Sequence, residues 1–251
     1  MSGHSHWAGI KHKKAVIDAK RGKLWSKLAR NILVAAKTGG PDPAGNLTLR
    51  YAIDKAKDAN MPRETIEKTI KKVTGGADAS NFEEVIYEGY GAHGVAIMVD
   101  VLTDNRNRTA SEIRHIFERH GSSLGAAGCV GWTFKKRGVF TVEAAHATED
   151  ALMEVALDAG ADDVQRDGDL FEITCAPDAY EQVKAALAQR QIPVKVAELS
   201  RVPDAYVTLN REGARKILGL MEELEDHDDV QNVYANFDIP PEIMKTIEAG
   251  A

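Results

Sequence analysis

The N-terminal part of this 251-residue chain concentrates positive charge. Between residues 11 and 30, Asp18 is the only acidic residue. The candidate contact residues here are Trp7, Lys11, His12, Lys13, Lys14, Lys20, Arg21, Lys23, Lys27 and Arg30. Cations at this density repel one another, and nucleic-acid phosphates are a natural counter-charge because binding them releases condensed counterions. Trp7 adds a ring that can stack on a base. The stretch therefore favours nucleic-acid contact over a solvated helix face.

A second candidate contact set is the segment Thr103–Thr109, between the end of an expected strand and the start of an expected helix. Its side chains include Asn105, Arg106, Asn107 and Arg108. Guanidinium and amide groups at a helix N-terminus suit a phosphate or an RNA backbone. The same residues also suit a structural loop, in which Asp104 pairs with an arginine and the asparagines cap turns. The residues alone leave both interpretations open.

The sequence gives no positive support for catalysis. It contains no Gly-x-Ser-x-Gly and no phosphate-binding Gly-x-x-x-x-Gly-Lys-Ser/Thr. Cys129 and Cys175 stand 46 positions apart and suggest reduced thiols in a cytosolic protein. We therefore predict no catalytic residues, no cofactor, no small-molecule substrate and a cytoplasmic, non-enzymatic protein.

Three further motifs are better explained by structure than by ligand binding. Gly89-x-Gly91-x-x-Gly94 has dinucleotide-binding spacing, but a strand is expected after it, so it is read as a hairpin turn. His4, His6 and His12 lack the spacing of a metal site. The acidic run 226–229 is read as a solvated loop. We therefore predict no metal site.

The net charge of −6 hides an asymmetry along the chain. Residues 1–80 carry 16 Lys and Arg against 7 Asp and Glu, whereas residues 81–251 carry 16 against 31. Such asymmetry indicates an interaction segment. No apolar run approaches the roughly 18 residues of a membrane span, so no membrane partner is expected.

The elements that position these residues begin with helices. On a helical wheel, residues 20–37 place Leu24, Leu28 and Ile32 opposite a cationic stripe that includes Lys23, Lys27 and Arg30. Further helices are predicted over 47–59 and 62–73. Residues 1–80 are thus predicted to be a basic helical domain.

From residue 82 the pattern predicts mixed α and β structure. Strands are expected at 85–87, 95–102 and 129–134, with a helix whose Thr109 and Glu112 are spaced as a capping box. Residues 137–199 then read strand, helix, strand, strand, helix, strand, which is the ferredoxin-like pattern. A strand, a helix capped by Asn210 and another strand follow over 204–237.

These segments predict an α+β fold of three domains. The pieces 81–134 and 201–240 are each too short to bury a core and are expected to pair into one discontinuous α/β domain. The ferredoxin-like βαββαβ domain, residues 135–200, is inserted between them. Residues 241–251 are expected to be a C-terminal tail.

The chain resembles the YebC/PmpR family, which includes the mitochondrial translational activator of cytochrome oxidase. The resemblance covers nearly the whole chain. It is carried by Gly3–Lys14, Asp18–Lys23, Ala52–Lys57, Asn60–Pro62, Glu88–Gly91 and Thr103–Thr109.

The resemblance implies the same three-domain fold and a regulatory function. Family members are described as DNA-binding regulators of transcription. Others act in translation at the ribosome, helping elongation through difficult sequences such as proline runs. Our hypothesis is a non-enzymatic DNA-binding regulator of transcription. The alternative is a ribosome-associated factor that binds rRNA and contacts ribosomal proteins.

Overall fold

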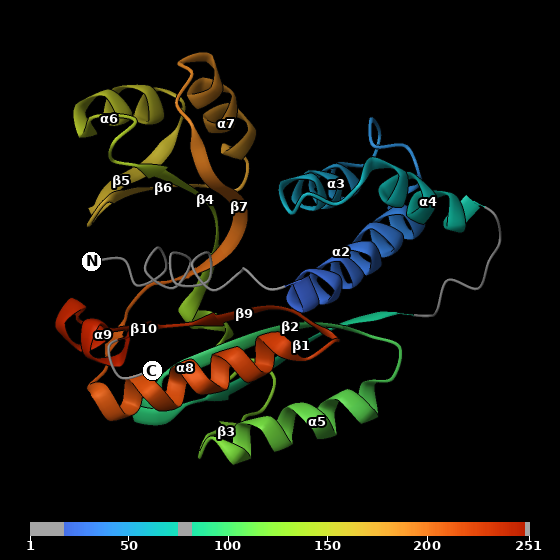
Figure 1. Ribbon diagram of the computed structural model, residues 1–251, viewed down its shortest axis with the longest axis vertical. Helices are drawn as coiled ribbons and strands as arrows, with labels where there is room; N and C mark the ends of the chain where they lie inside the picture. The colour runs from blue at the N-terminus through green and yellow to red at the C-terminus, as the bar shows by residue number, and fades with distance from the viewer. Residues whose placement is uncertain (1–17, 75–81, 249–251) are drawn as a thin grey trace.

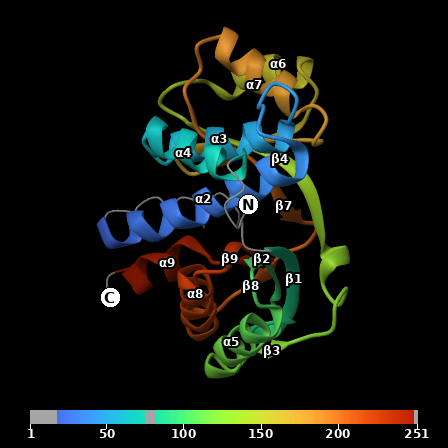
Figure 2. The same ribbon diagram turned by 90° about the vertical axis from the view of Figure 1, so that its right-hand side faces the viewer.

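A computed structural model describes residues 18–74 and 82–248 of the chain, without the side chains of residues 18–21, 74 and 248. The described residues form helices and mixed sheets, which confirms the predicted α+β class. They group into three units, each built around its own buried apolar cluster. Figures 1 and 2 show the inserted unit at one end, the central unit at the other and the helical unit alongside. No described helix is long and apolar enough to cross a membrane.

The helical unit consists of α2 (Asp18–Gly39), α3 (Leu47–Asp58) and α4 (Arg63–Thr74). Its core brings Leu28 and Ile32 of α2 against Ile53 of α3 and Ile66 of α4. Asn46 caps α3 by accepting the backbone N–H of Leu49, and its amide donates to carbonyls at the end of α2. The apolar spacing of the sequence therefore forms the predicted three-helix arrangement.

The central unit is a four-stranded sheet with the order β3-β1-β2-β9. Its strands are β1 (Glu83–Tyr90), β2 (Ala96–Thr103), β3 (Ser123–Leu124) and β9 (Val230–Ala235). Helices α5 (Arg106–Arg119) and α8 (Arg211–Asp226) pack their apolar residues into the same core. Because β2 pairs with β9, the expected pairing of the two distant segments is confirmed.

Short elements complete the central unit. The turn η1 (Ala92–Gly94) joins β1 to β2, so the glycine motif is a hairpin turn, as predicted. A pair of two-residue strands, β8 (Val207–Thr208) and β10 (Phe237–Asp238), lies beside the main sheet.

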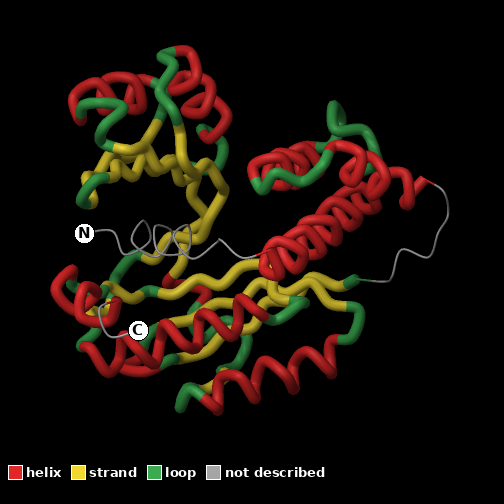
Figure 3. The backbone as a smooth tube through the Cα atoms, in the orientation of Figure 1, coloured by secondary structure: helices red, strands yellow, loops and turns green. Residues whose placement is uncertain are grey.

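The inserted unit is an antiparallel sheet in the order β5-β6-β4-β7, the strand order of the predicted ferredoxin-like fold. Its strands are β4 (Phe134–Glu143), β5 (Ala161–Asp167), β6 (Leu170–Cys175) and β7 (Val194–Pro203). The helices α6 (Glu149–Asp158) and α7 (Tyr180–Gln189) pack together above the sheet in Figure 3. The domain boundaries at 135 and 200 stay a prediction.

Three local predictions are wrong. Residues 129–134 do not form a strand: η2 (Gly131–Thr133) is a 3-10 turn, and β4 begins at Phe134. The helix α5 is capped by Asn105 and not by Thr109, which lies buried inside its first turns. The expected tail contains α9 (Pro241–Glu248), because its apolar residues Ile243, Met244 and Ile247 pack on the central core.

Gly138 of β4 tests how tightly the inserted unit is packed. A Cβ atom at this position would lie 2.5 Å from Sγ of Cys175 and 2.9 Å from a ring carbon of Tyr180. Both neighbours are buried, and the Tyr180 ring stacks on Phe140. Gly138→Ala is therefore expected to lower the free energy of unfolding by about 1–3 kcal/mol, measured by urea denaturation. Gly45→Ala, which meets no atom within 4 Å, is the control. Equal stability of the two variants would contradict this packing.

Candidate nucleic-acid interface

The predicted contact residues of the N-terminal part fall into three groups. Trp7, Lys11, His12, Lys13 and Lys14 lie outside the described residues. Lys20 and Arg21 belong to α2, but their side chains are not described. The described cations of the stripe are Lys23, Lys27 and Arg30, at intervals of four and three residues that place them on one face of α2.

This face of α2 lies against the central unit at the end of α8. The ammonium of Lys23 donates to the carbonyl of Asp226 at 3.3 Å, and that of Lys27 donates to the carbonyl of Glu225 at 2.5 Å. Carbonyls in the last turn of a helix carry the negative end of its dipole, which favours cations there. The cationic stripe is therefore an interdomain contact and not merely a solvated face.

Arg30 extends the contact from the helix end to a buried carboxylate. Its guanidinium donates to the carbonyl of Asp228 at 2.8 Å and to Oδ1 of Asp229 at 3.1 Å. Asp229 directly precedes β9 and is 6% exposed. The acidic run that the sequence suggested to be solvated thus contributes one buried acceptor to the junction of α2, α5 and β9.

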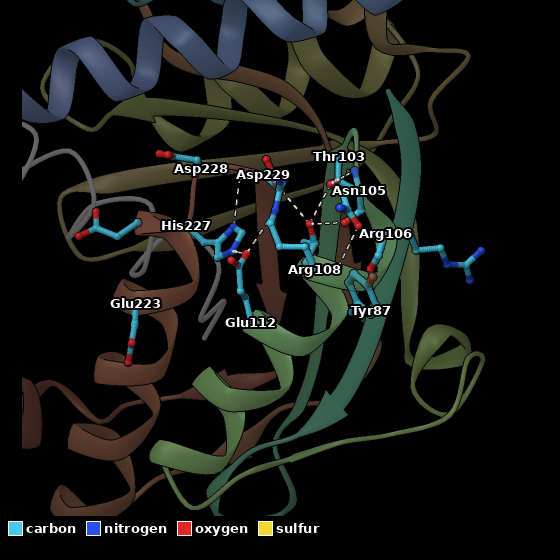
Figure 4. A network of polar contacts seen from close by, with 12 residues as sticks. Tyr87, Thr103, Asn105, Arg106, Arg108, Glu112, Glu223, His227, Asp228 and Asp229 are labelled. Carbon is cyan, nitrogen blue, oxygen red and sulfur yellow. Dashed lines mark hydrogen bonds and ion pairs between the residues drawn. The ribbon is translucent and has the colours of Figure 1, made fainter. Parts of the chain in front are cut away.

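The Asp229 carboxylate also organises the start of α5 (Figure 4). Its Oδ2 accepts from the guanidinium of Arg108 at 2.7 Å and from the hydroxyl of Thr109 at 2.8 Å. Burial by itself raises the pKa of this carboxyl, but the hydrogen bonds from Thr109 and Arg108 outweigh it and leave the pKa below its usual value. Asp229 is therefore held as a carboxylate.

The segment Thr103–Thr109 combines both interpretations that the sequence left open. Asn105 caps α5 by accepting the backbone N–H of Arg108, and Arg108 pairs with Asp104 at 3.0 Å as well as with Asp229. Asn105 and Arg108 are therefore already bonded within the protein. Arg106 and Asn107 are exposed, and no ion pair joins the Arg106 guanidinium to another described residue. The outer part of the segment is thus available to a ligand.

Glu112, His227 and Asp229 bring potential metal-ligand atoms within 4.8 Å of one another. All three are already bonded within the protein. His227 Nε2 lies 2.9 Å from a Glu112 oxygen, and His227 Nδ1 accepts the backbone N–H of Asp229 at 3.1 Å. This cluster stabilises the turn into β9 and needs no ion to satisfy its polar groups.

Sequence reasoning missed Asp229 as a member of this site. It lies 199 residues from Arg30 and 121 from Arg108, so no local spacing connects them. The only available signal was the opposite charge of the two parts of the chain.

Replacing Arg106 or Arg108 by glutamine is expected to have different effects on the thermal unfolding midpoint. Arg108→Gln removes the contacts with Asp229 and Asp104, so its thermal midpoint should fall. Arg106→Gln should leave the midpoint unchanged, because surface substitutions away from such contacts have small effects. Thermal unfolding followed by circular dichroism would compare the two. An equal fall in both variants would show that Arg106 also supports the fold.

Known proteins resemble this chain over almost its entire length. A family model described as "TACO1/YebC protein N-terminal domain" matches residues 5–76, and one described as "TACO1/YebC second and third domain" matches residues 82–237. A relative from Natranaerobius thermophilus, named "Probable transcriptional regulatory protein", is 52% identical and aligns over 98% of this chain and all of its own. A relative from Dictyoglomus thermophilum with the same name is 53% identical, and the alignment covers 98% of this chain and all of the relative.

A solved structure shows the same architecture. The crystal structure of a conserved hypothetical protein from Aquifex aeolicus superimposes with a TM-score of 0.84 at 49% identity, covering 95% of this chain and 99% of that one. Together with the family models and full-length relatives, this likeness confirms the predicted resemblance: the chain belongs to the TACO1/YebC family.

Proposed function

We propose that this protein is a non-enzymatic regulator of transcription in the cytoplasm, and that it binds DNA through α2 and the basic residues before it. The observation that carries the proposal is the cationic face of α2. Lys23, Lys27 and Arg30 together reach four oxygen acceptors, of which three are backbone carbonyls and one is a carboxylate. A surface that gathers such acceptors also suits phosphate oxygens. The names of the full-length relatives support a role in transcription.

The distribution of charge within the helical region supports the same surface. Residues 11–30 contain eight Lys and Arg against one acid, whereas the rest of residues 1–80 contain eight against six. In that second group, ion pairs such as Arg63 with Glu67 and Lys57 with Asp54 balance part of the charge. The excess that attracts a polyanion therefore comes from α2 and the preceding residues.

Arg106 and Asn107 provide a second contact point in this proposal. They are exposed in the first turn of α5, where backbone N–H groups and the helix dipole favour an anion. Tyr87 donates its hydroxyl to the carbonyl of Arg106 at 3.2 Å, which fixes the backbone of that turn (Figure 4). Phosphates bound at α2 and at α5 would hold one nucleic acid at two places.

The test compares promoter DNA with unrelated DNA at physiological salt. We expect binding to duplex promoter DNA to survive excess unrelated duplex, and to weaken strongly when Lys13, Lys14, Lys20 and Arg21 are all replaced by glutamine. Each lost phosphate contact should lower the slope of log affinity against log salt by about 1. Equal competition by any duplex would overturn the transcription proposal.

The same variant separates DNA from the ribosome as the target. The described candidate residues would donate hydrogen bonds to phosphate oxygens. Phosphate contacts do not distinguish promoter DNA from ribosomal RNA. If the protein shows no preference among duplexes but co-sediments with ribosomes, and the quadruple variant loses that co-sedimentation, the target is ribosomal RNA. Crosslink mapping would then identify the contacted RNA and ribosomal proteins.

A further inference from the structure

The helical unit attaches to the central unit through polar contacts. Three cations of α2 reach residues 225–229, here called the acidic loop. On the other side of the same junction, Lys55 of α3 donates to the Asn232 side chain at 3.3 Å. The apolar core of the helical unit contains only residues of that unit. The contacts named here between these two units are polar, and their donors and acceptors can exchange partners with water and ions.

The helical unit touches the inserted unit differently. Tyr51 of α3 meets the Tyr180 ring edge-on, with ring centroids 5.8 Å apart, and packs against the apolar cluster of the inserted unit. A half-exposed ion pair, Lys184 with Asp54, also joins the two units. The apolar contact at Tyr51 would persist while the polar contacts with the acidic loop break. Rotation of the helical unit about Tyr51 is therefore the favoured way for α2 to separate from the acidic loop.

The acidic loop resembles a nucleic-acid backbone in charge. It ends α8, so its carbonyls carry partial negative charge, and it adds the exposed carboxylates of Asp226 and Asp228 to the buried one of Asp229. Asp226, Asp228 and Asp229 line a cavity of about 550 Å³ together with Lys23, Arg30 and Arg108. The α2 cations that would bind phosphate are therefore facing an internal set of anionic acceptors.

Releasing Arg30 leaves no buried charge without a partner. When Arg30 moves away, the Asp229 carboxylate still accepts from Arg108 at 2.7 Å and from Thr109 at 2.8 Å. An unpaired buried carboxylate would make separation costly, but here the remaining donors keep it satisfied. The arrangement can therefore open on the α2 side without disturbing the start of α5.

We propose that the acidic loop occupies the nucleic-acid-binding face of α2 as an internal competitor, and that phosphates displace it when nucleic acid binds. This inference rests on the proposed function, since it describes the regulation of the same surface. Lys23, Lys27 and Arg30 exchange the acceptors of the loop for phosphate oxygens, and α2 moves away from the central unit about its contact at Tyr51.

The first test removes charge from the competitor. In Asp226→Asn/Asp228→Asn, both changes lie at exposed positions of the loop. The matched control, Asp158→Asn/Asp178→Asn, changes the net charge equally at exposed positions of the inserted unit. We expect the loop variant to bind a 20-base-pair DNA duplex about threefold or more tightly at 0.1 M salt, and the control to change affinity less than about twofold. Equal effects of the two variants would overturn the inference.

The second test measures displacement directly, because charge removal alone can also act at long range. Spin labels at Ser26→Cys on α2 and Arg215→Cys on α8 report the distance between the two helices, in a Cys129→Ser background where Cys175 is fully buried. We expect the distance to lengthen on addition of the duplex. An unchanged distance at saturation overturns the inference even if the loop variant binds more tightly, and leaves DNA binding in place. If no variant binds the duplex or ribosomal RNA, the proposed function fails and the inference fails with it.

Discussion

Glu88→Ala is expected to lower the free energy of unfolding by about 3–5 kcal/mol. The Glu88 carboxylate is buried and accepts three backbone N–H groups: that of Gly128 at 2.9 Å, and those of Val130 and Gly131 at 2.7 Å each. Alanine would leave three donors without their acceptor in the segment that leads from the central sheet to β4. Charge-assisted hydrogen bonds of this kind stabilise by about 1.5–3 kcal/mol each, although not additively.

Chemical denaturation would measure this effect against two variants. Glu84→Ala removes an exposed carboxylate from the same strand and should change the stability by less than about 0.5 kcal/mol. Glu88→Gln retains one acceptor oxygen but turns a donor toward the N–H groups, so it should fall between the two. A Glu88→Ala protein as stable as Glu84→Ala would show that the segment 128–131 does not depend on the carboxylate.

Asp229→Asn is expected to lower the free energy of unfolding at neutral pH by about 1.5–3 kcal/mol. It should also make that free energy depend less on pH in the acid range. The amide nitrogen of asparagine would face the donors of Arg108 or Thr109, which now bond a carboxylate. Because the folded protein lowers the pKa of Asp229, this residue contributes stability above its unfolded pKa, near 3.9. That contribution disappears as the pH falls through the folded pKa.

The prediction is checked by measuring unfolding free energy from pH 7 to pH 2. The difference between wild type and Asp229→Asn should be largest above about pH 5 and shrink below about pH 4. Asp226→Asn, an exposed neighbour in the acidic loop, is the control and should track the wild type. A difference that stays constant across this range would indicate that the carboxylate charge is not what stabilises the junction.

The order of elements was predictable because it depends on neighbouring residues. Apolar spacing predicted α2, α3 and α4, and the strand and helix order predicted the ferredoxin-like sheet. Asn210 was correctly predicted to cap α8, where its side chain accepts the backbone N–H of Gly213 at 2.8 Å. Such signals depend only on residues within a few positions of the element that they determine.

Errors occurred where a distant partner decides a residue's role. Thr109 has the spacing of a helix cap, yet its hydroxyl bonds the Thr103 hydroxyl and the Asp229 carboxylate inside the protein. Residues 129–134 look extended in the sequence, but the Glu88 carboxylate binds the N–H groups of Gly128, Val130 and Gly131 and holds them in a turn. In both cases a buried polar group must find a partner, and the nearest one in space is far away in the chain.

The sequence by itself determined that one end of this protein is basic, that the rest is acidic, and which helices and strands carry those charges. Only the tertiary structure decided that Lys23, Lys27 and Arg30 meet the end of α8, and that Arg106 stays exposed while Arg108 pairs with Asp229. The physical reason is that charge and periodicity are local properties, whereas the partner of a charge depends on which surfaces the packed cores bring together.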